Sequence, residues 1–210
     1  MSETVEWVRV LDRATGEVRE LSASECGFRY RGSIFKYRDR WVVLAVAFRL
    51  RRLAESGPLR YAELVRAVGE RAPLADVREA VLRLRRGKGM VIDPDDPDSV
   101  SAGSFFTNPV LDAEELGALR ERAGADPPAW PEADGRVKTS AAWLIERAGF
   151  HRGYGNGRAG ISTKHTLALV NRGGATTAEL VGLAREIAAG VQERLGVQLE
   201  PEPVLVGVRW

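Results

Sequence analysis

A short stretch from Ser101 to Pro109 (SAGSFFTNP) combines a hydroxyl group, an amide and two aromatic rings. Gly103 tolerates backbone conformations that other residues avoid, and Pro109 disfavours the helical conformation at Asn108. We therefore expect a rigid, non-helical crossing that presents the Ser104 hydroxyl and the Asn108 amide beside a wall of the two phenylalanines. The alternative is a buried turn whose phenylalanines belong to the core, the usual meaning of a short motif taken alone.

Three other chemistries are disfavoured by context. Gly155–Gly160 (GNGRAG) matches the G-x-G-x-x-G phosphate-binding pattern, which needs a strand before it and a helix N-terminus after it. Here a helix precedes the motif, and a predicted strand, Ile161–Val170, follows it. A Ser-His-Asp hydrolase using Ser104 and His165 lacks the G-x-S-x-G elbow. One cysteine and two distant histidines, His151 and His165, give no metal-ligand spacing.

The composition indicates an ordinary soluble globular protein. Its 210 residues are 44% hydrophobic and 29% charged, enough for one large or two small domains with a core. A net charge of +2 gives no electrostatic argument for nucleic acid as a partner. Cys26 is the single cysteine, which fits a reducing compartment. No signal core and no apolar run approaching the ~20 residues of a membrane span are visible, so we expect a cytoplasmic protein without a membrane partner.

The first half of the chain predicts a hairpin, a strand and two helices. Val5–Val10 and Glu17–Leu21 flank a glycine-containing turn and predict a β-hairpin. Trp41–Leu50 is apolar on both faces and rich in β-branched residues, which predicts a buried strand. Helices are expected at about residues 61–68 and 74–86, the second with a continuous apolar stripe.

The second half begins after Asp93–Asp98 (DPDDPD), a proline-punctuated acidic loop that marks the clearest boundary. Asp112 and Ser140 are placed to cap helices, residues 125–135 with three prolines predict a loop, and Thr166–Asn171 predicts a strand.

A further helix is predicted after that strand. Thr176 and Glu179 form a capping-box pair, apolar residues recur at helical spacing as far as Leu195, and Gly196 ends the helix. Residues 197–208 are expected to be extended. Helices interleaved with strands predict an α/β or α+β chain.

Three motifs occur together in a fixed order: Tyr30–Lys36 (YRGSIFK), Gly103–Pro109 (GSFFTNP) and Leu199–Glu202 (LEPE). This combination resembles the UDP-N-acetylenolpyruvoylglucosamine reductases, also called UDP-N-acetylmuramate dehydrogenases, the flavoenzymes of peptidoglycan precursor synthesis. The similarity runs from about residue 5 to about residue 207, and three motifs in register are far more specific than one. The resemblance implies an α+β flavin-binding domain followed by a smaller α/β substrate-binding domain.

The resemblance also implies a reaction and three catalytic residues. In this family NADPH reduces FAD, and the flavin passes a hydride to the β-carbon of UDP-N-acetylglucosamine enolpyruvate, so negative charge develops on the α-carbon and carboxylate. Arg31 matches the catalytic arginine, whose planar fork suits a carboxylate. Glu202 matches the catalytic glutamate, and Ser104 matches the serine that protonates the α-carbon. Acid–base reasoning alone would not select a serine hydroxyl, and each of the three residues taken alone reads equally well as a solvated or capping group.

For the uridine diphosphate sugar, the resemblance implies five contacts. Tyr61 is expected as an aromatic lid, Lys88 and Asn108 near the diphosphate, His165 at a further polar contact, and Tyr30 on the substrate side of its motif. A lysine beside a diphosphate is chemically apt but not diagnostic, and the sequence around Lys88 departs from the common family form.

The resemblance divides the chain into three parts. Residues 1–98 are expected to be the C-terminal half of an FAD-binding domain, residues 99–196 a UDP-sugar-binding domain, and residues 197–210 a strand that returns to the flavin side carrying Glu202. The loop that cradles the flavin pyrophosphate in this family has no match in the sequence. We therefore expect a missing N-terminal flavin-binding segment, apolar exposure in residues 1–55 and no turnover by the chain alone. The alternative is a non-catalytic UDP-sugar-binding remnant.

Overall fold

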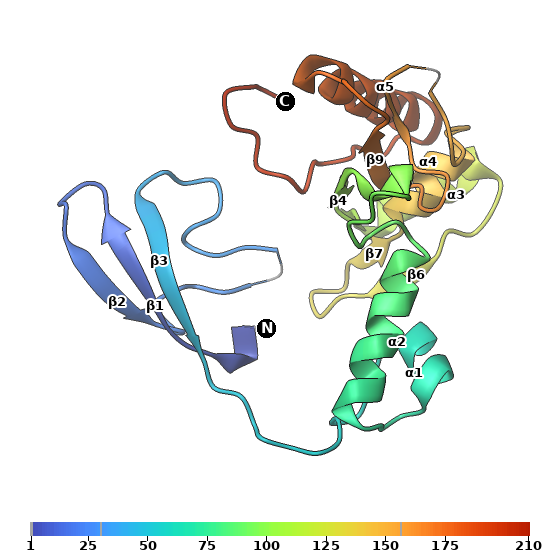
Figure 1. Ribbon diagram of the computed structural model, residues 1–210. Helices are drawn as coiled ribbons and strands as arrows, with labels where there is room; N and C mark the ends of the chain where they lie inside the picture. Colours follow the sequence, from blue (N-terminus) through green and yellow to red (C-terminus); the bar gives the residue numbers. More distant parts are fainter. Residues whose placement is uncertain (1, 30, 156) are drawn as a thin grey trace. The chain divides into compact units, whose positions relative to one another are not determined.

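The computed structural model describes residues 2–29, 31–155 and 157–210. Its contacts divide the chain into two compact units, unit 1 (Met1–Glu55) and unit 2 (Ser56–Trp210). Each unit combines short elements with small antiparallel sheets, and the helices lie in unit 2 apart from one short 3-10 turn, η1 (Ser2–Thr4) (Figure 1). The predicted α+β class is confirmed. The division by contacts falls before the helices of residues 62–86, whereas the sequence placed its boundary at residue 98.

Unit 1 is a three-stranded antiparallel sheet. Strands β1 (Val5–Asp12), β2 (Val18–Ser22) and β3 (Trp41–Phe48) lie in the order β2-β1-β3, so the predicted hairpin is confirmed. A small cluster of buried side chains forms its core: Val8, Val10, Leu21 and Cys26.

Strand β3 forms as predicted but is not buried. Val43 and Leu44 are consecutive and point to opposite faces, yet their exposed fractions are 45% and 50%. The prediction of a buried strand is therefore wrong for these residues, and the prediction of high apolar exposure in residues 1–55 is confirmed. The physical reason is that a single small sheet has too few side chains to cover both faces of an apolar strand.

Unit 2 begins with two packed helices, α1 (Ala62–Val68) and α2 (Leu74–Arg86). The bounds predicted for α2 are confirmed, and Arg83, Arg85 and Arg86 lie in its last turn, where cations suit the helix dipole. A 3-10 turn, η2 (Pro97–Ser99), then leads into the sheets.

Two three-stranded antiparallel sheets follow in unit 2. The first contains β4 (Ser101–Ser104), β9 (Ala168–Asn171) and β8 (Ala159–Ile161) in the order β4-β9-β8. The second contains β5 (Val110–Leu111), β7 (Val137–Thr139) and β6 (Ala129–Pro131) in the order β5-β7-β6. Strand β6 corrects the loop predicted for residues 125–135, because pairing with β7 holds three of those residues extended.

Helices α3 (Ala113–Ala123), α4 (Ala141–Arg147) and α5 (Thr177–Leu195) pack around one core with these sheets. The predicted caps at Asp112, Ser140 and Thr176 are all confirmed, since each side chain accepts a hydrogen bond from a backbone amide in the first turn of its helix. Gly196 ends α5 in the left-handed conformation, with φ of 73°.

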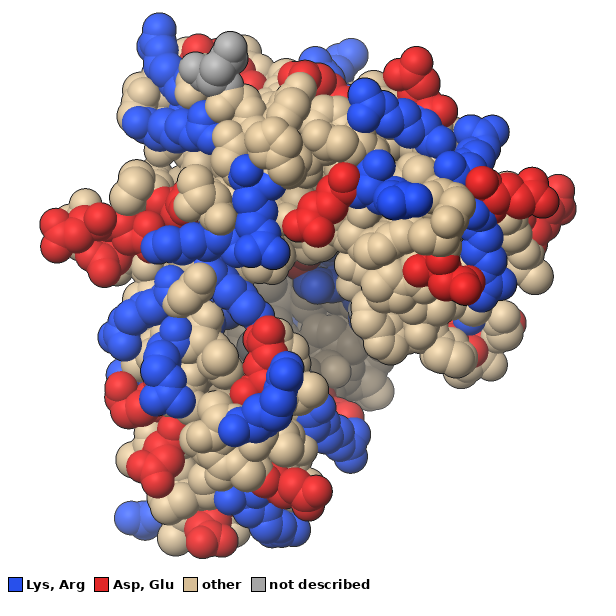
Figure 2. Space-filling model, turned by 90° about the vertical axis from the view of Figure 1, so that its right-hand side faces the viewer, with Lys and Arg blue, Asp and Glu red and all other residues tan. Residues whose placement is uncertain are grey.

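The strand predicted for residues 197–210 is reduced to a single bridge between Phe106 and Pro201. This segment nevertheless packs closely, because Val197 and Leu199 lie in the core of unit 2. In the described part of the chain, none of the helices combines the length and apolar character needed to cross a membrane. Figure 2 shows Lys and Arg side chains interspersed with Asp and Glu, as expected from a net charge of +2.

Candidate functional site

Ser104 and Glu202 are brought together by backbone hydrogen bonds. Ser104 is the last residue of β4 and pairs with Ala168 of β9. The next residue, Phe105, accepts a hydrogen bond at its carbonyl oxygen from the Glu202 amide at 2.8 Å. The Thr107 amide donates to the Glu200 carbonyl at 3.0 Å, so the two segments are held on both sides of Phe106. Two residues far apart in sequence therefore flank the same short stretch of chain.

The aromatic pair beside Ser104 belongs to the core. Phe105 and Phe106 are each 2% exposed, and their rings meet edge to face with centroids 5.1 Å apart. The ring of Trp210 packs on both, at 6.2 Å and 6.1 Å between centroids. The two segments joined by the backbone hydrogen bonds of Phe105 and Thr107 are called the Ser104–Glu202 crossing. The phenylalanines form a rigid buried base beneath this crossing, whereas the sequence predicted a wall beside Ser104 and Asn108.

Asn108 has a structural contact that the sequence prediction did not include. Its side-chain oxygen accepts a hydrogen bond from the Ala141 amide at 3.0 Å. Ala141 is the first residue of α4, so this contact satisfies an amide that the helix itself leaves unpaired.

Lys88 and Tyr61 are brought together through a residue that sequence reasoning missed, Glu63. The Lys88 ammonium donates to the Glu63 carboxylate at 2.5 Å and to the Tyr61 hydroxyl at 3.0 Å. The Tyr61 hydroxyl in turn donates to the same Glu63 oxygen at 3.1 Å, and the ammonium lies 5.5 Å from the Tyr61 ring centroid. The hydrogen bond from Lys88 lowers the pKa of Glu63, and the bond to Glu63 raises the pKa of Lys88. Both groups are therefore charged at neutral pH.

His165 lies near this cluster on the turn between β8 and β9. Burial lowers its pKa, and the positive charges of Lys88 and Arg152 lower it further against the opposing effect of Glu146. Its Nδ1 accepts a hydrogen bond from the Leu167 amide at 3.1 Å, which assigns the ring proton of the neutral form to Nε2. The structure thus offers an Nε2–H donor among charged groups.

Asp98 connects the Lys88 turn to the His165 turn. Its carboxylate accepts a hydrogen bond from the Thr163 amide at 3.2 Å. Gly89 packs against Asp98 and has a positive φ of 66°. A Cβ atom at Gly89 would lie 3.0 Å from the Asp98 carbonyl oxygen. Only glycine allows this close approach, which places the neighbouring Lys88.

Two predicted residues cannot be placed relative to this site. Tyr30 lies outside the described residues. Arg31 belongs to unit 1, where its φ of 51° is in the left-handed region that non-glycine residues rarely adopt. The convergence of Arg31 with Ser104 and Glu202 stays a prediction.

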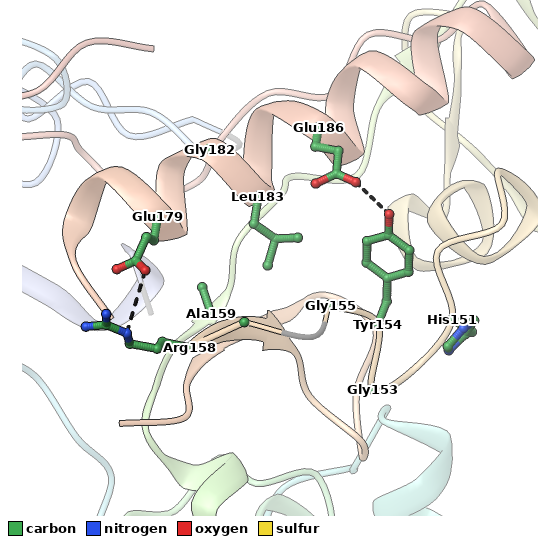
Figure 3. Close-up of a pocket in the computed structure, with 11 residues that line it drawn as sticks. His151, Gly153, Tyr154, Gly155, Arg158, Ala159, Glu179, Gly182, Leu183 and Glu186 are labelled. Atoms are coloured by element: carbon green, nitrogen blue, oxygen red, sulfur yellow. Dashed lines mark hydrogen bonds and ion pairs between the residues drawn. The ribbon is translucent and has the colours of Figure 1, made fainter. Parts of the chain in front are cut away.

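A separate cavity of about 610 Å³ lies between α5 and the glycine-bearing residues 153–155 and 157–159 (Figure 3). Tyr154 donates to Glu186 at 2.5 Å across it, and Arg158 approaches Glu179 at 3.9 Å. Its described lining residues include none of the predicted site residues.

Neither glycine-bearing segment near this cavity fits a dinucleotide pyrophosphate. In the G-x-G-x-x-G match, β8 begins at Ala159, and a Cβ on Gly155 would lie 3.1 Å from the Ala159 carbonyl oxygen. The single strand predicted over Ile161–Val170 is wrong: β8 ends at Ile161, residues 162–167 form a turn, and β9 begins at Ala168. Among the described residues no helix begins at this motif, so the inference that its context does not fit a dinucleotide site stands. Gly173 and Gly174 precede α5, but the carboxylate of Glu179 and the Thr176 cap occupy that helix N-terminus, so an anion would meet a negative charge.

Unit 2 is thus an α+β domain with a polar site in which a lysine and a tyrosine meet near a half-buried histidine, and with a serine–glutamate crossing at the end of strand β4. The profile of the family described as "UDP-N-acetylenolpyruvoylglucosamine reductase, C-terminal domain" matches residues 95–206. The chain belongs to this family.

Individual relatives agree with this assignment. The chain is 61% identical to a UDP-N-acetylenolpyruvoylglucosamine reductase of Thermobifida fusca and 60% identical to one of Salinispora arenicola, over 99% and 98% of its length. It spans only 61% and 59% of those two relatives. The crystal structure of the reductase from Thermus caldophilus aligns with a TM-score of 0.54 and 25% identity, covering 96% of this chain and 52% of that one.

The residues that sequence reasoning missed carried weak signals. Glu63 stands two positions after Tyr61, at the start of a predicted helix, where an acidic residue is common for dipole reasons alone. Glu146 and Arg152 act on His165 from segments distant in sequence, and only the tertiary structure shows that proximity.

Proposed function

We propose that this chain is part of an FAD-dependent, NADPH-using reductase that converts UDP-N-acetylglucosamine enolpyruvate to UDP-N-acetylmuramate in the cytoplasm, a step of peptidoglycan precursor synthesis. Family membership and the names of the relatives support the reaction. The observation that carries the substrate assignment is the hydrogen bond between Lys88 and Tyr61 in unit 2, near enough to His165 for the Lys88 charge to lower the pKa of that histidine. The resemblance assigned all three to the UDP-sugar, and the fold gathers them from separate segments.

The diphosphate of the substrate is the ligand of this cluster. The Lys88 ammonium supplies a positive charge and the Tyr61 hydroxyl a donor, while the His165 Nε2–H supplies a neutral donor that does not depend on protonation. We assign the contact of Asn108 to its amide nitrogen, because the amide oxygen is used by Ala141. Tyr61 is 57% exposed, which suits an aromatic side chain that covers a bound ligand.

The reacting end of the substrate is assigned to the crossing. Ser104 Oγ donates the proton that the α-carbon receives, and Glu202 stabilises the enol-like state from the adjoining segment, to which it is hydrogen-bonded through Phe105. Arg31 holds the substrate carboxylate. These three roles come from the family motifs, and the backbone link between Ser104 and Glu202 supports two of them.

FAD and NADPH supply the two electrons in this family, but the glycine-bearing segments of unit 2 described above do not fit the flavin pyrophosphate. We therefore assign the flavin cradle to a further polypeptide segment, which corresponds to the part of the relatives that this chain does not span. Strand β3 supports this assignment, because its apolar residues are exposed on both faces and a packed neighbour would bury them.

The second candidate function is a UDP-sugar-binding remnant without turnover. It is favoured by the placement of Tyr61, Lys88, Ser104 and Glu202 within unit 2 alone, whereas Arg31 belongs to unit 1. A flavin absorbance band in the purified chain, or turnover of NADPH with the enolpyruvyl substrate, would favour the reductase over the remnant.

Isothermal titration calorimetry on the 210-residue chain tests the substrate assignment, which both candidates share. UDP-N-acetylglucosamine should bind, and UDP-glucose, which lacks the N-acetyl group, should bind more weakly. Lys88→Met should weaken both ligands about tenfold or more, because the ammonium is the charge that faces the diphosphate. Equal or absent heats for the two sugars with the folded chain would refute the assignment.

A further inference from the structure

Glu63 lies where an anionic ligand of Lys88 and Tyr61 would have to lie. One oxygen of its carboxylate accepts hydrogen bonds from the Lys88 ammonium at 2.5 Å and from the Tyr61 hydroxyl at 3.1 Å. A phosphate oxygen bound by the same two donors would occupy the same point. The carboxylate and a phosphate oxygen are both strong acceptors that take charge-assisted hydrogen bonds from lysine.

The cluster is accessible enough for such an exchange. The side chains of Lys88 and Glu63 are 28% and 38% exposed, so neither is locked in the core. Tyr61 is the N-cap residue of α1, and its side chain makes no cap hydrogen bond, which leaves the ring unattached to the helix start. The contacts of the Tyr61 hydroxyl with Glu63 and Lys88 tie this exposed ring down.

We propose that the Glu63 carboxylate is an internal substitute for a phosphate group, which holds Lys88 and Tyr61 in the ligand-free chain and is displaced when a nucleoside diphosphate sugar binds. This inference rests on the proposed function, since it assumes that Lys88 and Tyr61 face the diphosphate. It adds a residue that opposes binding. Glu63 pre-positions the two donors, and its negative charge competes with the ligand for them.

The displaced carboxylate must also find a new partner or remain close to the incoming phosphates. Either result costs binding free energy, because the ion pair with Lys88 is lost or like charges come together. Glu63 therefore weakens the binding of the ligand, and it holds Tyr61 in place when the site is empty. It is a positioning residue that lowers the affinity for the ligand. Removing its charge should therefore raise the affinity, whereas replacing a residue that only supports the fold should not.

The test compares two changes at this position. Glu63→Gln keeps the shape and one acceptor oxygen but removes the charge, and Glu63→Asp keeps the charge. By calorimetry, Glu63→Gln should bind UDP-N-acetylglucosamine about three- to tenfold more tightly than the unchanged chain, and Glu63→Asp should not gain affinity. The gain should be smaller for uridine 5′-monophosphate than for UDP, because the effect follows the phosphate charge.

A matched control is available in the same unit. Lys138 of β7 and Glu132, which directly follows β6, form an ion pair at 2.6 Å with side chains 24% and 28% exposed. Glu132→Gln should change neither the affinity for UDP-N-acetylglucosamine nor the ratio of the affinities for UDP and uridine 5′-monophosphate. Circular dichroism of each variant should show the same secondary structure, so that a change in affinity is not a change in folding.

The outcomes separate this inference from the proposed function. If the unchanged chain binds the UDP-sugar and Glu63→Gln binds it equally or more weakly, Glu63 only supports the site and the inference is wrong. If no folded variant binds any uridine phosphate, the proposed UDP-sugar site is wrong, and the inference fails with it. A gain of affinity in Glu132→Gln equal to that in Glu63→Gln would show a general charge effect and would also overturn the inference.

Discussion

Replacing Trp210 by alanine should release the segment that carries Glu202. The indole ring packs on Phe105 and Phe106 and is 40% exposed, so the remaining 60% of its surface is buried. A tryptophan side chain has roughly 250 Å² to bury, which gives about 150 Å² here and, at about 25 cal/mol per Å², at most about 4 kcal/mol. The contact between the Arg185 guanidinium and the Arg209 carbonyl, at 2.8 Å, remains in the variant.

Hydrogen exchange at two amides measures this release. The Glu202 amide donates to Phe105 and the Thr107 amide donates to Glu200, so both report whether the segment stays on the crossing. We expect Trp210→Ala to speed their exchange about tenfold or more, and Trp210→Phe, which retains an aromatic ring, to restore most of the protection. The amide of Leu144 in α4 is the internal control. Unchanged exchange at Glu202 in Trp210→Ala would refute the idea that this ring holds the segment.

Three further predictions follow from contacts of single residues. Asn108→Ala should lower the free energy of unfolding, measured by urea denaturation, by about 1 kcal/mol because the Ala141 amide loses its acceptor. Asn108→Asp keeps an acceptor oxygen and should restore much of this stability, and equal stability of all three chains would contradict the prediction. Leu44→Ala in the 210-residue chain should lower the free energy of unfolding by under about 1 kcal/mol because the side chain is exposed, whereas Val10→Ala, at a buried position, should lower it by about 2 kcal/mol. A loss for Leu44→Ala larger than that for Val10→Ala would show that β3 is covered. The folded pKa of His165 lies below its ordinary 6.5, so the unfolded chain binds more protons; stability should therefore be present above pH 6.5 and be lost as the pH falls from there through the folded pKa. His165→Gln should remove that part of the slope, and an unchanged slope would assign it to other groups.

Local chemistry made several elements predictable from the sequence alone. Helix α5 begins at a capping box and ends at a left-handed glycine, and both signals act within a few residues of the chain. The hairpin β1–β2 was equally readable, because its strands alternate and its turn contains a glycine. The family could be recognised for the same reason, since each of its three motifs is a short continuous segment.

Tertiary structure alone decided the features that depend on distant partners. Three residues within a proline-rich loop became β6 because β7 pairs with them, and β3 became exposed because one small sheet cannot cover both of its faces. Local sequence cannot encode such pairings, whose stability comes from segments brought together on folding.

The same distinction applies to the site. The sequence determined which residues were candidates, since Tyr61, Lys88, His165, Ser104 and Glu202 all came from motifs and resemblance. Only the fold showed that Phe105 links Ser104 to Glu202 and that the Asn108 side-chain oxygen accepts a hydrogen bond from the first amide of α4. Only the fold showed that the Glu63 carboxylate, two residues after Tyr61, binds the Lys88 ammonium. A hydrogen bond depends on the positions of two atoms in space, and a linear sequence specifies those positions only through the folded chain.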